Sequence, residues 1–283
     1  MLFSSSPIEV AAKSSKPTFK YQYGVFISVN ANRIVKRAKD YETIVVDAQY
    51  YTKSDLQKLH QKGHVVYSYI NLGSLEDWRD YYKKYKDITI GRYDGWEDES
   101  WVDVSQKKWQ DKLKAVSKSL VNKGVDGLFV DNIDVYEYVT DQMSAKQRKA
   151  YKVSAKKIYS GITTILKDFR GLKKKGSKKK IQVILNGGTS YVAAFRGKNK
   201  GSAKAVMTGI NQESVFSEYN NSDGIQDKDS SKEYQRQLQK NKKDGMKVYL
   251  LEYTSDKKLI KRIRDYCKKH GYEAYITSSV NLE

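Results

Sequence analysis

The sequence repeats one short unit, in which a helical segment stops at a glycine and an apolar strand follows at once. Glycine ends helices readily because it adopts the left-handed backbone conformation that follows the last turn. Four units are plain, with predicted helices at 54–62, 106–123, 232–244 and 257–270, then Gly63, Gly124, Gly245 and Gly271, then predicted strands at 64–70, 126–131, 247–253 and 273–277. Short apolar strands that alternate with helices predict a parallel sheet covered on both faces.

Eight strands are predicted in total, because segments 23–28, 43–48, 182–186 and 209–215 also have strand character. Eight strand–helix units close a (β/α)8, or TIM, barrel, and 283 residues suit one such domain. An open, doubly wound sheet is the alternative, disfavoured because no G-x-G-x-x-G follows the first strand and no P-loop occurs. We therefore predict an α/β chain with an N-terminal tail at 1–20 and a single barrel domain at 21–283.

Two inserts interrupt the repeat. Residues 72–104, between the third and fourth repeating units, are rich in aromatic and acidic side chains, and we expect them to roof a site. Residues 173–180, before the fifth strand, are mostly lysine and predict a solvated loop.

Charge and composition limit the partners. The formal net charge is +20, from 53 Lys and Arg against 33 Asp and Glu, which attracts polyanions at low salt. The lysines are spread through nearly every helix-like segment, so we expect a solvated basic surface and no specific nucleic-acid partner, with an anionic cell-wall surface as a further candidate partner. No apolar run approaches the roughly 20 residues of a transmembrane helix, so no membrane span is predicted.

Cysteine usage and the N-terminus say little about location. Cys267 is the single cysteine, which excludes an internal disulfide and leaves the compartment open. Residues 1–12 lack a basic n-region and their apolar stretch is broken by polar residues, so no intact signal peptide is predicted there.

The predicted strands end in polar residues, many of them acids. In a barrel of this kind the active face is built from the C-terminal ends of the strands. The polar and aromatic residues at or just after these ends are Asp47, Tyr69, Asn71, Asp131, Asn132, Asp134, Asn186, Gln212, Glu213, Glu218, Glu252 and Tyr253. We expect catalytic and substrate-binding residues among them.

Asp131 and Glu213 are the predicted catalytic pair. Two carboxylates on opposite sides of a sugar-sized cleft divide the work of glycosidic cleavage, since one protonates the leaving oxygen while the other attacks or activates water. Asp131 ends an otherwise apolar strand, where a carboxylate is costly to bury without a function. The alternative is that Asp131 caps the next helix or pairs with a lysine, and Glu218 lies close enough to Glu213 to compete for its assignment.

Aromatic side chains also gather in or after the strand ends, where sugar rings would stack. They are Tyr50, Tyr51, Tyr67, Tyr69, Trp78, Trp96, Trp101, Tyr136 and Tyr253. We predict substrate contacts for Tyr69, Trp78 and Tyr253, and ordinary packing for several of the others.

Metal, cofactor and Ser-His-Asp chemistries are poorly supported. His60 and His64 are four residues apart, but Gly63 ends the helix between them and no glutamate follows His60. No histidine ends a predicted strand, which disfavours a catalytic triad. The pair Gly187–Gly188 alone is weak evidence for a phosphate site. We therefore predict no metal and no cofactor.

Five motifs follow one another along the chain: VVYSYINLG at 65–73, EDWR at 76–79, WVDV at 101–104, GVDGLFVDNID at 124–134 and NQE at 211–213. In this order they resemble the motifs of the glycoside hydrolase family 114 barrels, which include endo-α-1,4-polygalactosaminidases. The resemblance spans residues 23–277. It implies endo-acting hydrolysis of α-1,4 linkages in an exopolysaccharide that contains galactosamine or a related amino sugar, outside the cell or at its surface.

The same resemblance implies that the predicted pair is catalytic and that Asp47 and Asp134 contact the polysaccharide substrate. Relatives often have an acid directly after the third-strand motif, where this chain has Ser74, and an acid before the strand-six glutamate, where it has Gln212. A partly deacetylated polymer of galactosamine is cationic, so acids in the cleft would have to offset the repulsion from a +20 protein. An acetylated, nearly neutral substrate is the alternative.

Two other functions stay open. The altered Ser74 and Gln212, with the many tyrosines, would suit a carbohydrate-binding barrel without catalysis. The net charge would suit a basic surface protein that binds cell-wall or other polyanions, with an affinity that falls steeply as salt rises.

Overall fold

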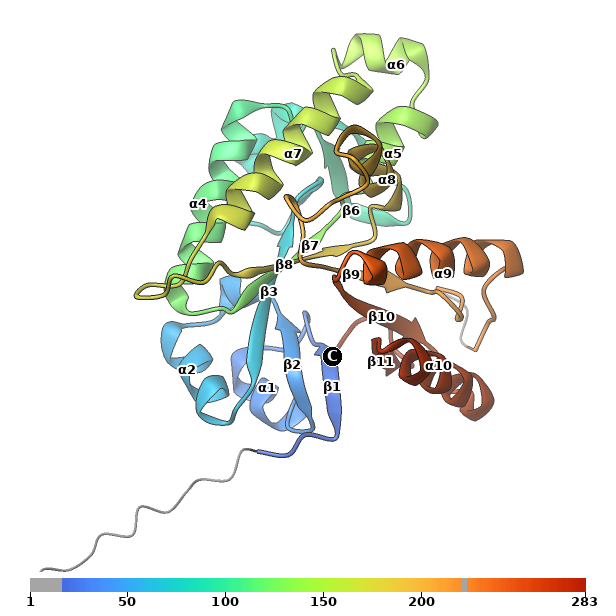
Figure 1. Ribbon diagram of the computed structural model, residues 1–283. Coiled ribbons are helices and arrows are strands. Elements are labelled where there is room, and N and C mark those ends of the chain that lie inside the picture. The colour runs from blue at the N-terminus through green and yellow to red at the C-terminus, as the bar shows by residue number, and fades with distance from the viewer. Residues whose placement is uncertain (1–16, 220–222) are drawn as a thin grey trace, which may run out of the picture.

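Eight parallel strands form a nearly closed barrel in the computed structural model, which describes residues 17–219 and 223–283 (Figure 1). In their order around the barrel the strands are β1 (Tyr21–Val25), β2 (Tyr41–Val46), β3 (Val65–Asn71), β7 (Gly127–Asp131), β8 (Gln182–Asn186), β9 (Gly209–Glu213), β10 (Lys247–Tyr253) and β11 (Glu273–Thr277). All neighbouring pairs are parallel, and β11 lies beside β1. The fold is a (β/α)8 TIM barrel, as the sequence predicts.

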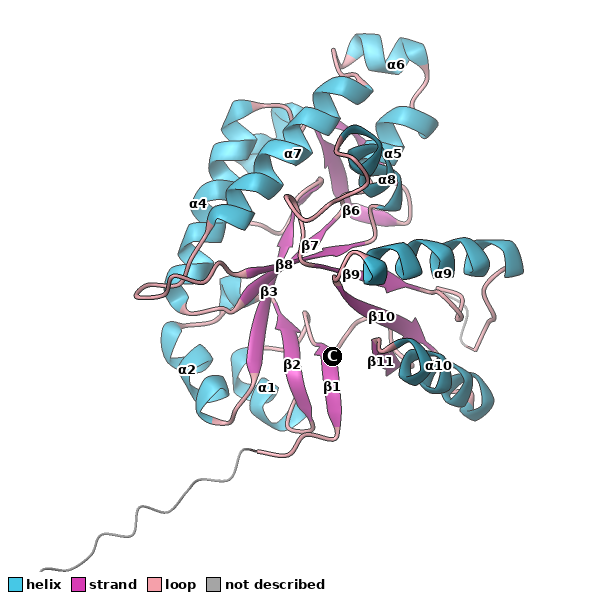
Figure 2. Ribbon diagram, viewed as in Figure 1, coloured by secondary structure: helices cyan, strands magenta, loops and turns pink. Residues whose placement is uncertain are grey.

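Helices surround the strands on the outside of the barrel (Figure 2). The longer ones are α1 (Ala31–Arg37), α2 (Lys53–Gln61), α4 (Lys107–Lys123), α7 (Ala155–Gly171), α8 (Thr189–Lys198), α9 (Lys228–Lys243) and α10 (Lys257–His270). The start of α9 was predicted four residues too late. Asp227 moves it forward, because its carboxylate accepts hydrogen bonds from the backbone N–H groups of Asp229 and Ser230 and so caps the helix earlier.

The insert at 72–104 folds into a small three-stranded antiparallel sheet of order β4-β6-β5. Its strands are β4 (Ser74–Glu76), β5 (Thr89–Tyr93) and β6 (Trp96–Val102), and the short helix α3 (Tyr82–Tyr85) lies between β4 and β5. The insert is anchored to the barrel wall at its start, where the buried Trp109 of α4 donates its indole N–H to the carbonyl of Leu72 at 2.9 Å. The sequence did not predict these strands.

Tyrosines fill the barrel interior. The rings of Tyr23 and Tyr249 lie 4.3 Å apart between centroids, and Tyr67 is buried beside Gly127. A Cβ on Gly127 would come within 2.8 Å of the Tyr67 ring, so a residue without a side chain is required there. Tyr67, which the sequence placed among the candidates for sugar contact, is therefore part of the core.

The outer surface is basic and polar. Residues 173–180 form a largely exposed loop, as expected, and Lys174 pairs with Asp126, which also lies 2.9 Å from Nε2 of His60. Nδ1 of His64 contacts the carbonyl oxygen of Tyr41 instead. Within the described residues, no helix has both the length and the apolar character needed to cross a bilayer.

Candidate active site

A cleft with a volume of about 810 Å³ opens at the C-terminal ends of the strands. This is a size that binds sugar-sized ligands. The predicted site residues that line it are Asp47, Tyr69, Trp78, Asp131, Asn132, Asp134, Asn186, Glu213 and Tyr253. The small sheet of the insert forms a further wall of the cleft, beside the residues that the barrel strands provide.

Asp131 and Glu213 lie on either side of Asn186, at the ends of β7, β9 and β8. The Asn186 amide nitrogen donates to Oδ1 of Asp131 at 2.9 Å and to Oε1 of Glu213 at 2.6 Å. Because one amide nitrogen reaches both, these two oxygens lie no more than about 5.5 Å apart. The sequence-predicted pair is thus brought together by a single neutral side chain.

A chain of hydrogen bonds fixes the orientation of Asn186. Its Oδ1 accepts from Nδ2 of Asn211 at 2.7 Å, and Oδ1 of Asn211 accepts from the hydroxyl of Tyr23 at 3.1 Å. With its oxygen occupied in this way, Asn186 must present its NH₂ group to the two acids. On the other side, the Tyr253 hydroxyl donates to Oε2 of Glu213 at 2.5 Å.

Burial and mutual repulsion hold protons on this pair. Burial, followed by the charge of Glu213, raises the pKa of Asp131 to about 8. Burial also raises the pKa of Glu213, and the hydrogen bonds from Tyr253 and Asn186 offset part of that increase. The pKa of about 8 keeps a proton on the pair at neutral pH, and carboxyls this close titrate as a coupled pair.

The residue after each of the two acids adopts a left-handed backbone conformation. Asn132 follows Asp131 with φ 60°, and Ser214 follows Glu213 with φ 53°. Few residues other than glycine adopt this conformation, and such strain is concentrated at functional sites. The turn at Asn132 brings its carbonyl so close to Gly73 that a Cβ there would lie 1.8 Å from the oxygen.

Asp134 lies on the cleft wall against the Gly187–Gly188 pair. The backbone N–H of Gly188 donates to Oδ1 of Asp134 at 3.1 Å, and both glycines have positive φ, 65° and 71°. The Gly187–Gly188 loop, which the sequence offered as weak evidence for a phosphate site, therefore binds a carboxylate of the protein itself. Burial raises the pKa of Asp134 to about 6.

Asp47 belongs to a buried cluster centred on Arg79. The Arg79 guanidinium pairs with Asp47 at 2.8 Å and with Glu76 at 2.5 Å. It also lies over the ring of Tyr50, 5.4 Å from the centroid. The sequence identified Glu76 and Arg79 only as part of a motif, because both come from the insert and not from a barrel strand.

Exposed aromatic side chains line the mouth of the cleft. Tyr50, Trp78 and Trp96 are 63%, 50% and 43% exposed. Trp96 lies 6.3 Å from Tyr219, whose ring packs edge-on against Tyr253 at 5.2 Å. Tyr219 was not predicted, because it lies in a loop beyond the end of β9.

Trp101 and Tyr136 lie away from this cleft, contrary to their inclusion among the sugar-contact candidates. Trp101 is buried and stacks on Tyr93 at 4.0 Å, and Tyr136 packs edge-on against Tyr159. Both rings pack within the protein instead.

Two predicted substrate contacts, Asn71 and Glu252, do not line the cleft. Glu252 is fully buried, and its carboxylate accepts hydrogen bonds from the backbone N–H groups at 215–217 and from the Ser217 hydroxyl. Successive strand residues point to opposite faces, so only one of Glu252 and Tyr253 can face the barrel interior, and it is Tyr253. The side-chain amide of Asn71 donates hydrogen bonds to the Ser74 hydroxyl and to Oε2 of Glu99.

The cleft is acidic although the protein is basic. Its acidic lining residues are Asp47, Glu76, Glu99, Asp131, Asp134, Glu137 and Glu213. Among the lining residues, which are all in the described part of the chain, Arg79 alone carries a permanent positive charge. The electrostatic potential inside the cleft is therefore negative, opposite in sign to that of the outer surface.

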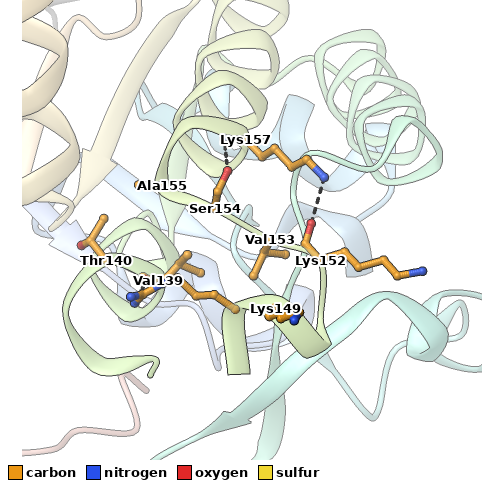
Figure 3. Close-up of a pocket in the computed structure, with 9 residues that line it drawn as sticks. Val139, Thr140, Lys149, Lys152, Val153, Ser154, Ala155 and Lys157 are labelled. Carbon is orange, nitrogen blue, oxygen red and sulfur yellow. Dashed lines mark hydrogen bonds between the residues drawn. The ribbon is translucent and has the colours of Figure 1, made fainter. Parts of the chain in front are cut away.

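A second hollow, of about 580 Å³, has the opposite character (Figure 3). It lies against the first turn of α7 and the short helix α6 (Ala145–Ala150), and its charged lining residues are Arg148, Lys149, Lys152 and Lys157. No acid is among the residues that line it. It therefore lacks the carboxylates that glycosidic cleavage needs.

A TIM barrel with two closely spaced carboxylates at its strand ends, in a cleft with exposed aromatic rings, has the architecture of a glycoside hydrolase. The model of glycoside-hydrolase family GH114 matches residues 4–282, and the chain belongs to this family.

Two solved structures of other proteins share the fold of this chain. The glycoside hydrolase domain of PelA from Pseudomonas aeruginosa superposes with a TM-score of 0.68 at 12% identity, covering 93% of this chain and 95% of that one. Ega3 of Aspergillus fumigatus, in complex with galactosamine, superposes with a TM-score of 0.66 at 17% identity, covering 95% of both chains. An uncharacterized protein of Thermotoga maritima is 23% identical in an alignment of 133 residues, which covers 43% of this chain and 41% of that protein.

Proposed function

We propose that this protein is an endo-acting glycosidase that cleaves internal α-1,4 linkages in a polysaccharide of galactosamine or a related amino sugar. The observation that carries the proposal is the shared donor, Asn186, which holds one oxygen of Asp131 and one of Glu213 within about 5.5 Å of each other in the cleft.

The spacing supports a mechanism that retains the anomeric configuration, for which carboxyl groups lie about 5–5.5 Å apart. One carboxylate attacks the anomeric carbon and forms a glycosyl ester while the other, protonated, gives its proton to the leaving oxygen. The second group then takes a proton from water, which hydrolyses the ester and restores both carboxyls. One proton on the pair is the charge state that this sequence of steps requires.

The acidic lining supports an amino sugar with free amines as substrate. Such a polymer is cationic, and the basic outer surface repels it at long range, but the acids of the cleft attract it locally. The galactosamine bound in the Ega3 structure has the same chemistry. The exposed rings of Tyr50, Trp78 and Trp96 support binding of an extended chain and hence internal cleavage.

Digestion of defined polymers tests the proposal. Purified galactosamine and glucosamine polymers, each with free and with acetylated amines, are incubated with the protein, and released oligosaccharides are read by mass spectrometry. Asp131→Asn and Glu213→Gln are expected to abolish product formation, whereas Asp111→Asn on α4 and Glu233→Gln on α9 change exposed carboxylates and are expected to act like the wild type. Full activity in either cleft variant would overturn the proposal, and binding without product would favour a carbohydrate-binding barrel.

Azide separates the roles of the two acids. With an aryl glycoside whose leaving group needs no proton, the variant that lacks the acid keeps its activity and forms a glycosyl azide of retained configuration. The variant that lacks the nucleophile forms an azide of inverted configuration. Inverted products from the wild type would contradict the retaining mechanism.

We also propose action outside the cell, with the basic hollow of Arg148, Lys149, Lys152 and Lys157 docking the protein on an anionic cell wall. The hollow has no acid among its lining residues, which supports binding of a phosphate-bearing polymer. Co-sedimentation with walls that keep or lack their phosphate polymers tests this. Lys149→Gln/Lys152→Gln protein should pellet less with intact walls while retaining activity on soluble polymer, and pelleting that is independent of wall phosphate would contradict docking.

A further inference from the structure

Glu99 of β6 is buried in the cleft wall, only 8% exposed, and is held through one of its two oxygens. Oε2 accepts hydrogen bonds from Nδ2 of Asn132 at 3.0 Å, from Nδ2 of Asn71 at 3.2 Å, and from the hydroxyl of Ser74. From the described residues, no hydrogen bond reaches Oε1. Oε1 is nevertheless not sealed inside the protein. Because Glu99 lines the cleft, we infer that Oε1 faces into it.

Glu99 has no direct ion-pair partner among the described residues, although the charge of Arg79 lowers its pKa to a small extent. Glu99 lies directly opposite Glu76 in the pairing of β4 with β6, an unfavourable arrangement for two acids. Arg79 pairs with Glu76 at 2.5 Å, but within the described chain no ion pair includes Glu99. Because Arg79 makes its direct contacts with Glu76 and Asp47, the buried carboxylate of Glu99 can still accept a direct contact from a cation supplied by a ligand.

The position of Glu99 relates it to the reacting bond. Asn132 donates its side-chain amide to Glu99 and its backbone N–H to Asp131, at 2.9 Å. Glu99 is therefore linked to Asp131 through a single residue, and its charge is one of those that raise the pKa of Asp131. The resemblance had implied an acid directly after Gly73, and here Ser74 occupies that position while Glu99, from another strand, places its carboxylate against the Ser74 hydroxyl.

We propose that Glu99 recognises the protonated amine of the sugar bound beside the catalytic pair, and so makes the protein selective for free over acetylated amino sugars. This inference rests on the proposed glycosidase function and names the residue behind its specificity. An ammonium carries three donors and a full charge, which Oε1 can accept, whereas an acetylated amine is neutral and larger. A metal ion would need more oxygen ligands than the single free oxygen of Glu99.

Burial raises the pKa of Glu99 and so disfavours its ionised form. The hydrogen bonds from Ser74, Asn71 and Asn132, and to a smaller extent the charge of Arg79, offset part of this increase by stabilising the ionised form. A bound ammonium adds the interaction that the ionised carboxylate lacks.

The test compares Glu99→Gln with wild type on matched oligomers that carry free or acetylated amines. We expect kcat/KM on the free-amine oligomer to fall about 100-fold, mostly through KM, and kcat/KM on the acetylated oligomer to stay level or rise. Glu97→Gln, on the exposed part of the same strand, is the control and should keep the preference. Equal losses on both oligomers would overturn the proposal, since they would mean that Glu99 only positions Asp131.

A binding experiment separates this inference from the proposed function. Asp131→Asn protein, with and without Glu99→Gln, is titrated with free-amine and with acetylated oligomers by calorimetry. Loss of the free-amine preference in the double variant supports the inference even if the wild type cleaves neither polymer, and an unchanged preference overturns it even if cleavage is confirmed. Glu99→Asp, which keeps the charge on a shorter side chain, should retain part of the preference and serves as the check should the glutamine variant fold poorly.

Discussion

Asp131 and Glu213 accept hydrogen bonds from the same nitrogen atom, Nδ2 of Asn186, at 2.9 and 2.6 Å. A lysine or arginine in this position would stabilise both carboxylates as anions and leave no protonated carboxyl group to act as the acid. A neutral amide positions both groups without supplying a charge. The pair can therefore keep the proton that glycosidic cleavage requires.

Replacing Asn186 by alanine is expected to lower kcat about 100-fold, because both acids lose the donor that orients them. The acidic limb of the pH profile should move to higher pH, since the Asn186 hydrogen bonds lower the pKa of both carboxyl groups. Steady-state rates on a free-amine oligomer between pH 4 and pH 9 check this. Asn122→Ala, on the exposed side of α4, is the control, and an unshifted profile in Asn186→Ala would contradict the positioning role.

Asp131→Asn is expected to be more stable than the wild type at alkaline pH while it loses activity. The pKa of Asp131 is about 8 in the fold, far above the ordinary value of 3.8. A raised pKa contributes stability that is complete at pH values below the ordinary pKa and is lost as the pH rises through 8. Asparagine does not titrate, so the Tm difference between variant and wild type should grow from pH 5 to pH 9.

Other buried acids, such as Glu252, titrate in both proteins and cancel in this comparison. Asp111→Asn should show a Tm difference that is flat with pH. A difference that shrinks toward pH 9 in Asp131→Asn would show that Asp131 is ionised without penalty and would refute the raised pKa.

Tyr253→Phe is expected to lower kcat about 10-fold, because Glu213 loses the hydroxyl that donates to Oε2. That bond lowers the pKa of Glu213, so its removal should shift the acidic limb of the pH profile upward. The ring still packs on Tyr219, so Tm should change little. Tyr234→Phe, at another tyrosine that lines the cleft, serves as the matched control, and an identical loss in both variants would indicate a general effect of polarity in the cleft.

The barrel could be predicted from the sequence, and so could the meeting of Asp131 and Glu213 at the strand ends, because both depend on local patterns. Glycine after each helix and the apolar strands identified the units, and an acid that ends an apolar strand identified Asp131. Glu99 could not be found in this way. It lies in the polar segment WEDES of the insert, which has no apolar alternation, and its importance comes from contacts with Ser74 and Asn132 that are distant in sequence.

The assignment of Glu252 shows a different limit. Strand alternation predicts that Glu252 and Tyr253 face opposite sides, but it does not say which one faces the barrel. The outer carboxylate is as buried as the inner hydroxyl, because the chain after β9 folds over it. Only the tertiary structure distinguishes a structural acid from a catalytic one here.

Trp96→Ala is expected to raise KM about 10-fold for long polymers and to leave cleavage of a small aryl glycoside unchanged. Trp96 is exposed and lines the cleft, and we expect it to stack on sugars away from the reacting bond. Kinetics on substrates of increasing length check this. Tyr151→Ala, an exposed aromatic outside the cleft, is the control, and equal losses on short and long substrates would contradict an extended binding site.

Glu252→Ala is expected to destabilise the protein by about 3 kcal/mol or more, because it leaves buried donors without an acceptor. The carboxylate accepts from the backbone N–H groups of Val215, Phe216 and Ser217, and from the Ser217 hydroxyl at 2.7 Å. That segment follows Glu213 directly, so activity should fall along with stability. Denaturant unfolding measures the loss, with the exposed Glu233→Ala as a control expected to cost under about 0.5 kcal/mol. A cost at Glu252 as small as at Glu233 would mean that other acceptors, or water, can replace the carboxylate.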